Sequence, residues 1–118
     1  MMIACQNGQT DVVKLLLEHS DVSEMNATNN SGSTAFMIAC QNGHKDVVQL
    51  LLDNSERIEL NARDDEKSTA FMIACQNGHK DVVKLLLDYS ERIEMNARNK
   101  NGCTAFLDAC GNGHQDVV

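Results

Sequence analysis

The sequence predicts an all-α fold, a solenoid of stacked helix-turn-helix units joined by hairpin-like loops. The main evidence is a 35-residue repeat, since residues 34–68 and 69–103 are identical at 27 of 35 positions. Apolar residues within each unit also recur at helical spacing. We expect one domain over residues 1–118, with a partial repeat at 1–33, full repeats at 34–68 and 69–103, and a partial repeat at 104–118.

Each unit is expected to open with a short helix, which the second unit carries at residues 35–42. Thr34 is a good N-cap because its hydroxyl can accept a hydrogen bond from an unpaired N–H of the first turn. Phe36 and Cys40 then share one face of the helix. Gly43 is expected to end it, since glycine adopts the left-handed conformation without a steric penalty.

A second helix is expected from Lys45 to about Asn54, followed by a polar connection over residues 55–68 that ends in a turn. Both helices are shorter than the roughly 12 residues that fold alone in water, so packing between units must hold them. The apolar stripe of the second helix consists of Val47, Val48, Leu50, Leu51 and Leu52.

Composition argues against several classes of partner. The chain has 42% hydrophobic and 23% charged residues, which is ordinary for a folded globular protein. No apolar run approaches the roughly 18 residues of a membrane span. The net charge of −7 disfavours nucleic acid and anionic membrane surfaces. Five cysteines and no secretory signal favour a reducing, cytoplasmic or nuclear setting.

The residues of each unit resemble the ankyrin repeat. The family's Thr-Pro-Leu-His-Leu-Ala-Ala signature corresponds to TAFMIAC at residues 34–40. Its Asn-Gly-His turn and Val-Val-x-Leu-Leu-Leu helix correspond to residues 42–52, and its Val-Asn-Ala segment to residues 25–27, 60–62 and 95–97. The resemblance covers essentially the whole chain. It implies an ankyrin-type solenoid that binds proteins, is not an enzyme and needs no cofactor.

The chain departs from the family pattern mainly in its loops. The family repeat is usually about 33 residues long, and the two extra residues here fall within residues 55–59. Ala35 stands at the first helical position, where proline is common. Met37 replaces a histidine, which exchanges a polar contact for adaptable packing. These changes concern loop geometry more than architecture.

The stretch FMIACQNGHKDVV, at residues 36–48 and again at 71–83, carries Cys, His and Asp, which could be metal ligands or catalytic groups. Equivalent residues of stacked units lie about 8–10 Å apart, too far for a disulfide or a shared zinc ion. We therefore interpret the thiols as core residues, the imidazoles as structural groups and the carboxylates as helix N-terminal charges. Gln9 replaces the histidine in the first unit, which a required ligand or base would not tolerate. The residues concerned are Cys5, Cys40, Cys75 and Cys110; His44, His79 and His114; and Asp11, Asp46, Asp81 and Asp116.

The resemblance places partner contacts on the loop tips and the edges of the first helices, along one concave surface. Five of the eight differences between the two full units are consecutive, at residues 64–68 against 99–103. Exposed turns tolerate change, or a partner selects them, and both alternatives stay open. The candidate partner-binding residues are Asn30, Ser31, Ser33, Ile38, Gln41, Asn42, Arg63, Asp65, Glu66, Ser68, Ile73, Gln76, Asn77, Arg98, Lys100, Asn101, Cys103 and Asn112.

Two features of this surface can be tested directly by a structure. Lys67 stands where a turn glycine is expected, which predicts a less regular or more mobile tip at residues 64–68. Ile38 and Ile73 are expected to be partly exposed beside the tips, as possible apolar anchors for a partner.

A modification site is implied by the resemblance alone. Asn26, Asn61 and Asn96 match the asparagine that asparaginyl hydroxylases modify in some ankyrin proteins. A structural role, with hydrogen bonds across the loop, is the alternative that we favour.

Two hypotheses for function follow. The first is a non-catalytic module that binds another protein through the concave surface, and the second is a structural spacer within a longer array. Neither end reads as the polar capping unit that solenoids need for solubility, so association through uncapped ends is also expected.

Overall fold

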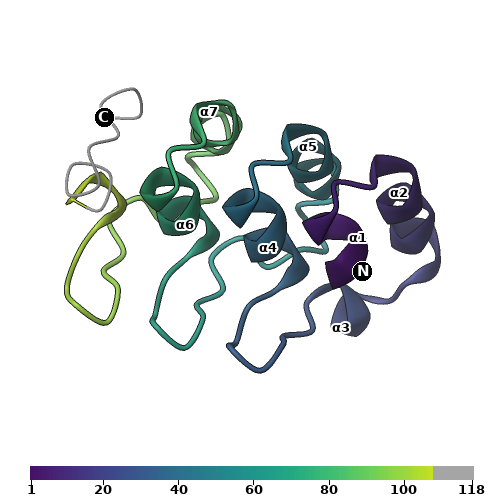
Figure 1. Ribbon diagram of the computed structural model, residues 1–118, viewed down its shortest axis with the longest axis horizontal. Helices are drawn as coiled ribbons and strands as arrows, with labels where there is room; N and C mark the ends of the chain where they lie inside the picture. The colour runs from purple at the N-terminus through teal and green to yellow at the C-terminus, as the bar shows by residue number, and fades with distance from the viewer. Residues whose placement is uncertain (108–118) are drawn as a thin grey trace.

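The computed structural model describes residues 1–107, which fold into helices joined by turns and long loops (Figure 1). Within this part of the chain there is no strand, so the predicted all-α fold is confirmed. The helices are α1 (Met2–Gln6), α2 (Thr10–His19), α3 (Val22–Met25), α4 (Ala35–Gln41), α5 (Lys45–Asp53), α6 (Ala70–Gln76) and α7 (Lys80–Leu87).

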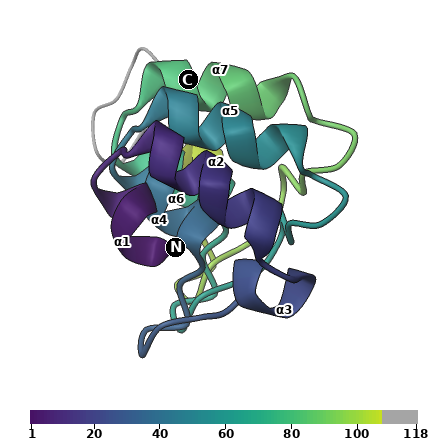
Figure 2. The ribbon, with the colours of Figure 1, turned by 90° about the vertical axis from the view of Figure 1, so that its right-hand side faces the viewer.

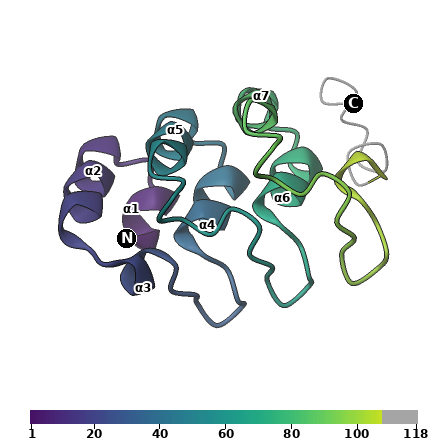
Figure 3. The ribbon, with the colours of Figure 1, turned by 180° about the vertical axis from the view of Figure 1, so that it is seen from behind.

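The helices form two layers. α1, α4 and α6 pack side by side in one layer, α2, α5 and α7 pack in the other, and each first helix also contacts the second helix that follows it. Seen along the stack, the helices of each layer overlap one another, and the long loops project from one edge (Figure 2). The view from behind shows the connections that lead from the second helices to these loops (Figure 3).

Helix boundaries follow the predicted signals closely. The Oγ1 atoms of Thr34 and Thr69 accept hydrogen bonds of 3.2 Å from the backbone N–H groups of Met37 and Met72. Gly43, with a φ of 70°, follows the end of α4 in the left-handed conformation. The first and second helices of this unit each end one residue earlier than expected. Acidic residues lie in the first turn of the second helices, as predicted, at Asp11, Asp46 and Asp81.

The core lies between the two layers and between successive helix pairs. Phe36, Met37, Leu51 and Leu52 are at most 2% exposed. The interpretation of the repeated thiols as core residues is confirmed for the described part of the chain, where they are buried at Cys5, Cys40 and Cys75. Cys110, His114 and Asp116 lie outside the described residues.

The first unit contains a short helix that the sequence patterns did not predict. In α3, the Oδ1 atom of Asp21 caps the helix by accepting a 2.8 Å hydrogen bond from the backbone N–H of Glu24. Ser23 stands in this helix at the repeat position where the later units have Ile58 and Ile93, both buried. The segment thus lacks that apolar residue and gains a capping Asp21 where the later units have Glu56 and Glu91.

Histidines connect each helix pair to the one before it. The Nε2 atoms of His44 and His79 lie 2.7 Å from the carbonyl oxygens of Gln6 and Gln41. Because a carbonyl can only accept, Nε2 carries the proton in each contact. The structural role is therefore confirmed for His44 and His79. The sequence did not predict that each histidine bonds to the preceding unit. A Cβ on Gly43 would lie 2.5 Å from Nδ1 of His79, so the close approach requires glycine.

Asparagine amides connect each unit to the next. Nδ2 of Asn61 donates to the carbonyl of Arg92 at 2.7 Å, and its Oδ1 accepts from the N–H of Glu94 at 2.8 Å. Asn26 makes the same two contacts with the backbone of residues 57 and 59. The favoured structural role is present at these two asparagines. They bond to the following unit rather than only across their own loop.

Candidate partner-binding groove

The loops end in three tips with one backbone design. We define tip 1 as residues 29–33, tip 2 as 64–68 and tip 3 as 99–103. In each tip, Oδ1 of the first residue accepts hydrogen bonds of 2.9–3.0 Å from the backbone N–H groups two and four positions later. The first and fifth residues also pair through their backbones. Asp and Asn both supply this oxygen, so either can open the turn. The residues that do so are Asn29, Asp64 and Asn99.

The expectation of a less regular tip 2 is wrong. Lys67 has a φ of 59°, close to the 75° and 78° of Gly32 and Gly102 at the same position. Its backbone N–H donates to the carbonyl of Asp64 at 2.9 Å, as the glycines do in their own tips. The left-handed conformation costs a non-glycine residue about 1–2 kcal/mol, and the two turn hydrogen bonds to the Asp64 carboxylate outweigh that penalty.

Successive tips are joined to one another. The N–H of Asp65 donates to the carbonyl of Ser31 at 3.0 Å, and the N–H of Lys100 donates to the carbonyl of Glu66 at 2.8 Å. The guanidinium of Arg63 reaches the carbonyl of Arg98 at 2.6 Å. These bonds hold the tips as a continuous rim rather than as separate loops.

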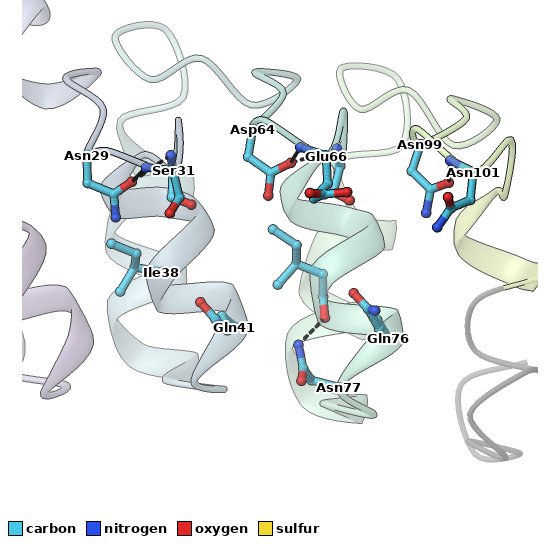
Figure 4. Close-up of a pocket in the computed structure, with 13 residues that line it drawn as sticks. Asn29, Ser31, Ile38, Gln41, Asp64, Glu66, Gln76, Asn77, Asn99 and Asn101 are labelled. Carbon is cyan, nitrogen blue, oxygen red and sulfur yellow. Dashed lines mark hydrogen bonds between the residues drawn. The ribbon is translucent and has the colours of Figure 1, made fainter.

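A groove of about 670 Å³ runs between this rim and the first helices α4 and α6 (Figure 4). The tips lie above it and the helices below it, with Gln41 and Gln76 projecting from the helices. Its lining residues are Asn29, Ser31, Ser33, Ile38, Gln41, Asp64, Glu66, Ser68, Ile73, Gln76, Asn77, Asn99 and Asn101.

Alternate residues of the tips line the groove: the first, third and fifth residues in tips 1 and 2, and the first and third residues in tip 3. The structure therefore brings together only part of the predicted set. Ser31, Ser33, Ile38, Gln41, Glu66, Ser68, Ile73, Gln76, Asn77 and Asn101 line the groove. Among the described residues, Asn30, Asn42, Arg63, Asp65, Arg98, Lys100 and Cys103 do not, and Asn112 lies outside the described part of the chain.

Sequence reasoning missed the first residue of every tip. Asn29, Asp64 and Asn99 line the groove as well as opening the turns. The signal was available, because Asn and Asp residues open tight turns of this kind.

The expected exposure of the two isoleucines is half right. Ile38 is partly exposed, but Ile73 is only 8% exposed and counts as buried. The tip that precedes Ile73 carries Glu66, whereas the tip that precedes Ile38 carries the much smaller Ser31. Ile73 therefore offers little exposed surface to a partner.

The charge of the groove is concentrated at tip 2. Asp64 and Glu66 are the charged residues among those that line it, and no Lys or Arg of residues 1–107 does so. Lys67 and Lys100 are exposed but lie on the rim outside the lining. The groove is therefore polar, with one negatively charged position flanked by neutral ones.

Other side chains of residues 1–107 form no chemical centre. Burial raises the pKa of the Cys5 thiol to about 11, although the N-terminal charge opposes the shift, and burial also raises the pKa of Cys40. Both stay protonated and away from solvent, unlike a nucleophilic thiolate. His, Cys, Asp and Glu do not gather in threes anywhere in this range, and none of its helices has the length and apolar character needed to cross a membrane.

Helix pairs joined by repeated contacts, with a groove between their tips and first helices, define a helical-repeat solenoid. A family model for ankyrin repeats, in three copies, matches residues 1–64 and 56–118, and the chain belongs to the ankyrin repeat family. Ankyrin repeats are generally non-catalytic modules for protein-protein interaction. Comparison with curated proteins gives no match.

Proposed function

We propose that this protein binds another protein through the groove between its tips and first helices, without catalysis. The observation that carries the proposal is the construction of the tips: one backbone design presents a different set of side chains at each position of the groove. A surface built in this way can be rigid while its chemistry varies.

Rigidity supports binding because a preformed surface loses less conformational entropy when a partner docks. The Asx hydrogen bonds fix each tip internally, and the bonds from Asp65 to Ser31 and from Lys100 to Glu66 fix each tip to its neighbour. The groove residues remain largely polar, which suits a specific and reversible interface.

A tip exchange tests the proposal. Replacing DDEKS of tip 2 by NNSGS of tip 1 retains the Asx turn and restores glycine at the left-handed position. Partners are captured from an extract of the native source and compared by quantitative mass spectrometry. We expect loss of a partner that the unaltered chain retains. The matched control, Glu56→Gln with Glu59→Gln, changes exposed residues that do not line the groove and should leave capture unchanged. Equal recovery with the exchanged tip would overturn the proposal.

The alternative function is a spacer within a longer array, and an exposed surface of the first unit supports this alternative. Val12 is 42% exposed, whereas Val47 and Val82, at the same repeat position, are 1% and 0% exposed because a preceding helix pair covers them. The side of the first unit on which Val12 lies thus matches an interface already used twice in the chain. If the protein is only a spacer, the tip exchange changes no partner.

The same face supports a proposal of self-association. Val12 lies on α2 and is exposed, whereas its counterparts Val47 and Val82 are buried. Sedimentation of the chain at rising concentration should show association that Val12→Lys weakens. A monomer at all concentrations would exclude it.

Two further proposals concern setting and modification. We propose a cytoplasmic or nuclear location, supported by buried thiols that are spaced one unit apart rather than paired. Localisation of a tagged chain in its native cell tests this proposal.

We also propose Asn96 as the site of hydroxylation among the three matching asparagines. Asn96 is exposed, while Asn26 and Asn61 are partly buried and bonded through both amide atoms. If peptide mass spectrometry finds no added oxygen on Asn96, hydroxylation of this residue is excluded.

A further inference from the structure

The first residues of the three tips hold the turn with the same atom, but they differ in the other polar atom of the side chain. Oδ1 of Asn29, Asp64 and Asn99 holds the turn in every tip. The remaining polar atom is an amide nitrogen at Asn29 and Asn99, which donates, but a carboxylate oxygen at Asp64, which accepts. The turn is therefore held in the same way in all three tips, and only in tip 2 does the first residue carry a negative charge.

Glu66 adds a second carboxylate to the same side of tip 2. It is exposed, it lines the groove with Asp64, and Ser31 and Asn101 hold its position in the other tips (Figure 4). Its backbone atoms take part in the rim, but no hydrogen bond of its carboxylate is found within residues 1–107. The groove thus presents two carboxylates at its centre with no lysine or arginine in its lining to neutralise them.

We propose that the partner enters this groove as an extended polypeptide segment that places one Arg or Lys side chain against Asp64 and Glu66. The inference rests on the proposed function and names the chemistry of its partner. Arginine fits best, because its planar guanidinium can donate several hydrogen bonds to two neighbouring carboxylates at once. An acidic segment would meet repulsion at the same place.

The repeat spacing sets the register of such a segment. Neighbouring first helices pack about 8–10 Å apart, and an extended or polyproline II chain advances about 3.1–3.3 Å per residue. One unit of the stack therefore spans about three residues of the partner. In a polyproline II conformation, side chains three positions apart point the same way. The residues three before and three after the cation then face the neutral tips 1 and 3.

The remaining groove residues suit the backbone of this segment. Gln41 and Gln76 are exposed, repeat at one unit's spacing and project into the groove (Figure 4). An amide side chain donates and accepts, so it can pair with both groups of a peptide bond. Ser31 adds a hydroxyl with the same capacity. An extended chain, whose own backbone groups are unpaired, is the conformation that uses these side chains.

The experiment uses the 118-residue chain and two libraries of 13-residue peptides, one with a central Arg and one with a central Glu, randomised elsewhere. Binders are selected on the chain and measured by fluorescence anisotropy. We expect binders from the Arg library and not from the Glu library. Small polar residues should be enriched three positions from the centre.

Two variants with the same change in net charge separate local recognition from general attraction. Asp64→Asn with Glu66→Asn copies the residues of tip 3, where asparagine already holds the turn. Asp65→Asn with Glu59→Gln removes two exposed carboxylates outside the groove. Charge-assisted hydrogen bonds lead us to expect roughly tenfold or greater weakening with the first variant and less than about twofold with the second. Thermal unfolding of both should match the unaltered chain.

Three outcomes would overturn the inference: no binder from the Arg library, equal enrichment from the Glu library, or equal weakening by the two variants. Gln41→Ala with Gln76→Ala distinguishes this failure from failure of the proposed function. If selected peptides lose affinity with that variant but ignore the charge of tip 2, the groove binds proteins by other chemistry. If they ignore both, the groove is not their site, and the proposed function loses its support from these probes.

Discussion

The contacts between helix pairs and the row of tips use the same 35-residue repeat in opposite ways. Between pairs, identical side chains make identical contacts, such as His44 and His79 with the preceding carbonyls. In the tips, a constant backbone carries different side chains, because the turn is held by hydrogen bonds to the Oδ1 atom of residue 29, 64 or 99.

The difference teaches where substitutions should have their effect. A side chain that contacts the neighbouring unit carries stability, because its loss leaves packed or bonded groups without partners. A tip side chain that faces the groove without holding the turn, such as that of Glu66, can change without such a loss. We therefore expect large effects on unfolding from the contacts between pairs and small ones from the tips, in the following order.

The largest effect is expected in the core. Leu51 on α5 is fully buried, so Leu51→Ala should lower the free energy of unfolding by about 3 kcal/mol through lost burial and a new cavity. Urea denaturation measures this. Leu15→Ala is the control, because Leu15 is 58% exposed and should change stability by less than about 1 kcal/mol. Equal losses would show that exposure in the stack does not decide stability.

A smaller effect is expected at the asparagine that joins two units. Asn61→Ala removes the bonds to the Arg92 carbonyl and the Glu94 N–H, which should reduce stability by about 2 kcal/mol. Asn96→Ala is the matched control at the same repeat position, since Asn96 is exposed. Its effect should stay below about 0.5 kcal/mol. If both variants unfold alike, the amide bonds do not hold the units together.

The buried thiols predict a loss of stability at alkaline pH. The pKa of Cys5 is raised to about 11 and that of Cys40 is raised as well, both chiefly by burial. Above about pH 9 the unfolded chain releases these protons and the folded chain retains them. Stability is therefore fully present below that pH and falls above it, by up to about 1.4 kcal/mol per pH unit for each thiol. Urea denaturation at pH 8, 9 and 10 should show a shallower decline for Cys40→Ala. An unchanged slope would contradict the assignment.

The stack was predictable from sequence because its signals are local and repeated. The roles of Thr34, Gly43 and the apolar stripe of α5 can each be predicted from the local sequence, without knowledge of contacts to other units. The helix α3 escaped prediction because Asp21, Val22 and Ser23 stand where the later units have Glu, Arg and Ile, and the effect of these changes depends on contacts within the folded loop.

The groove was harder to predict, because the folded turn decides which side chains of a tip face the groove. Asp65 and Glu66 are consecutive and were both predicted to bind a partner, but of the two only Glu66 lines the groove. Lys67 was misread for a related reason. Residue preference favours glycine at that position, but the hydrogen bonds to Asp64 decide the conformation.

The smallest effect is expected where tip 2 departs from its neighbours in backbone preference. Lys67→Gly should raise the free energy of unfolding by about 0.5–1 kcal/mol, because relief of left-handed strain exceeds the entropy that glycine adds to the unfolded chain. Gly102→Lys is the reverse change, and within residues 1–107 no atom beyond the adjoining residues lies within 4 Å of the added Cβ, so it tests the backbone. It should lower stability by a similar amount. Both are measured by urea denaturation. Opposite signs show that the tips are one structure with interchangeable residues, whereas destabilisation by Lys67→Gly would mean that the lysine side chain itself supports tip 2.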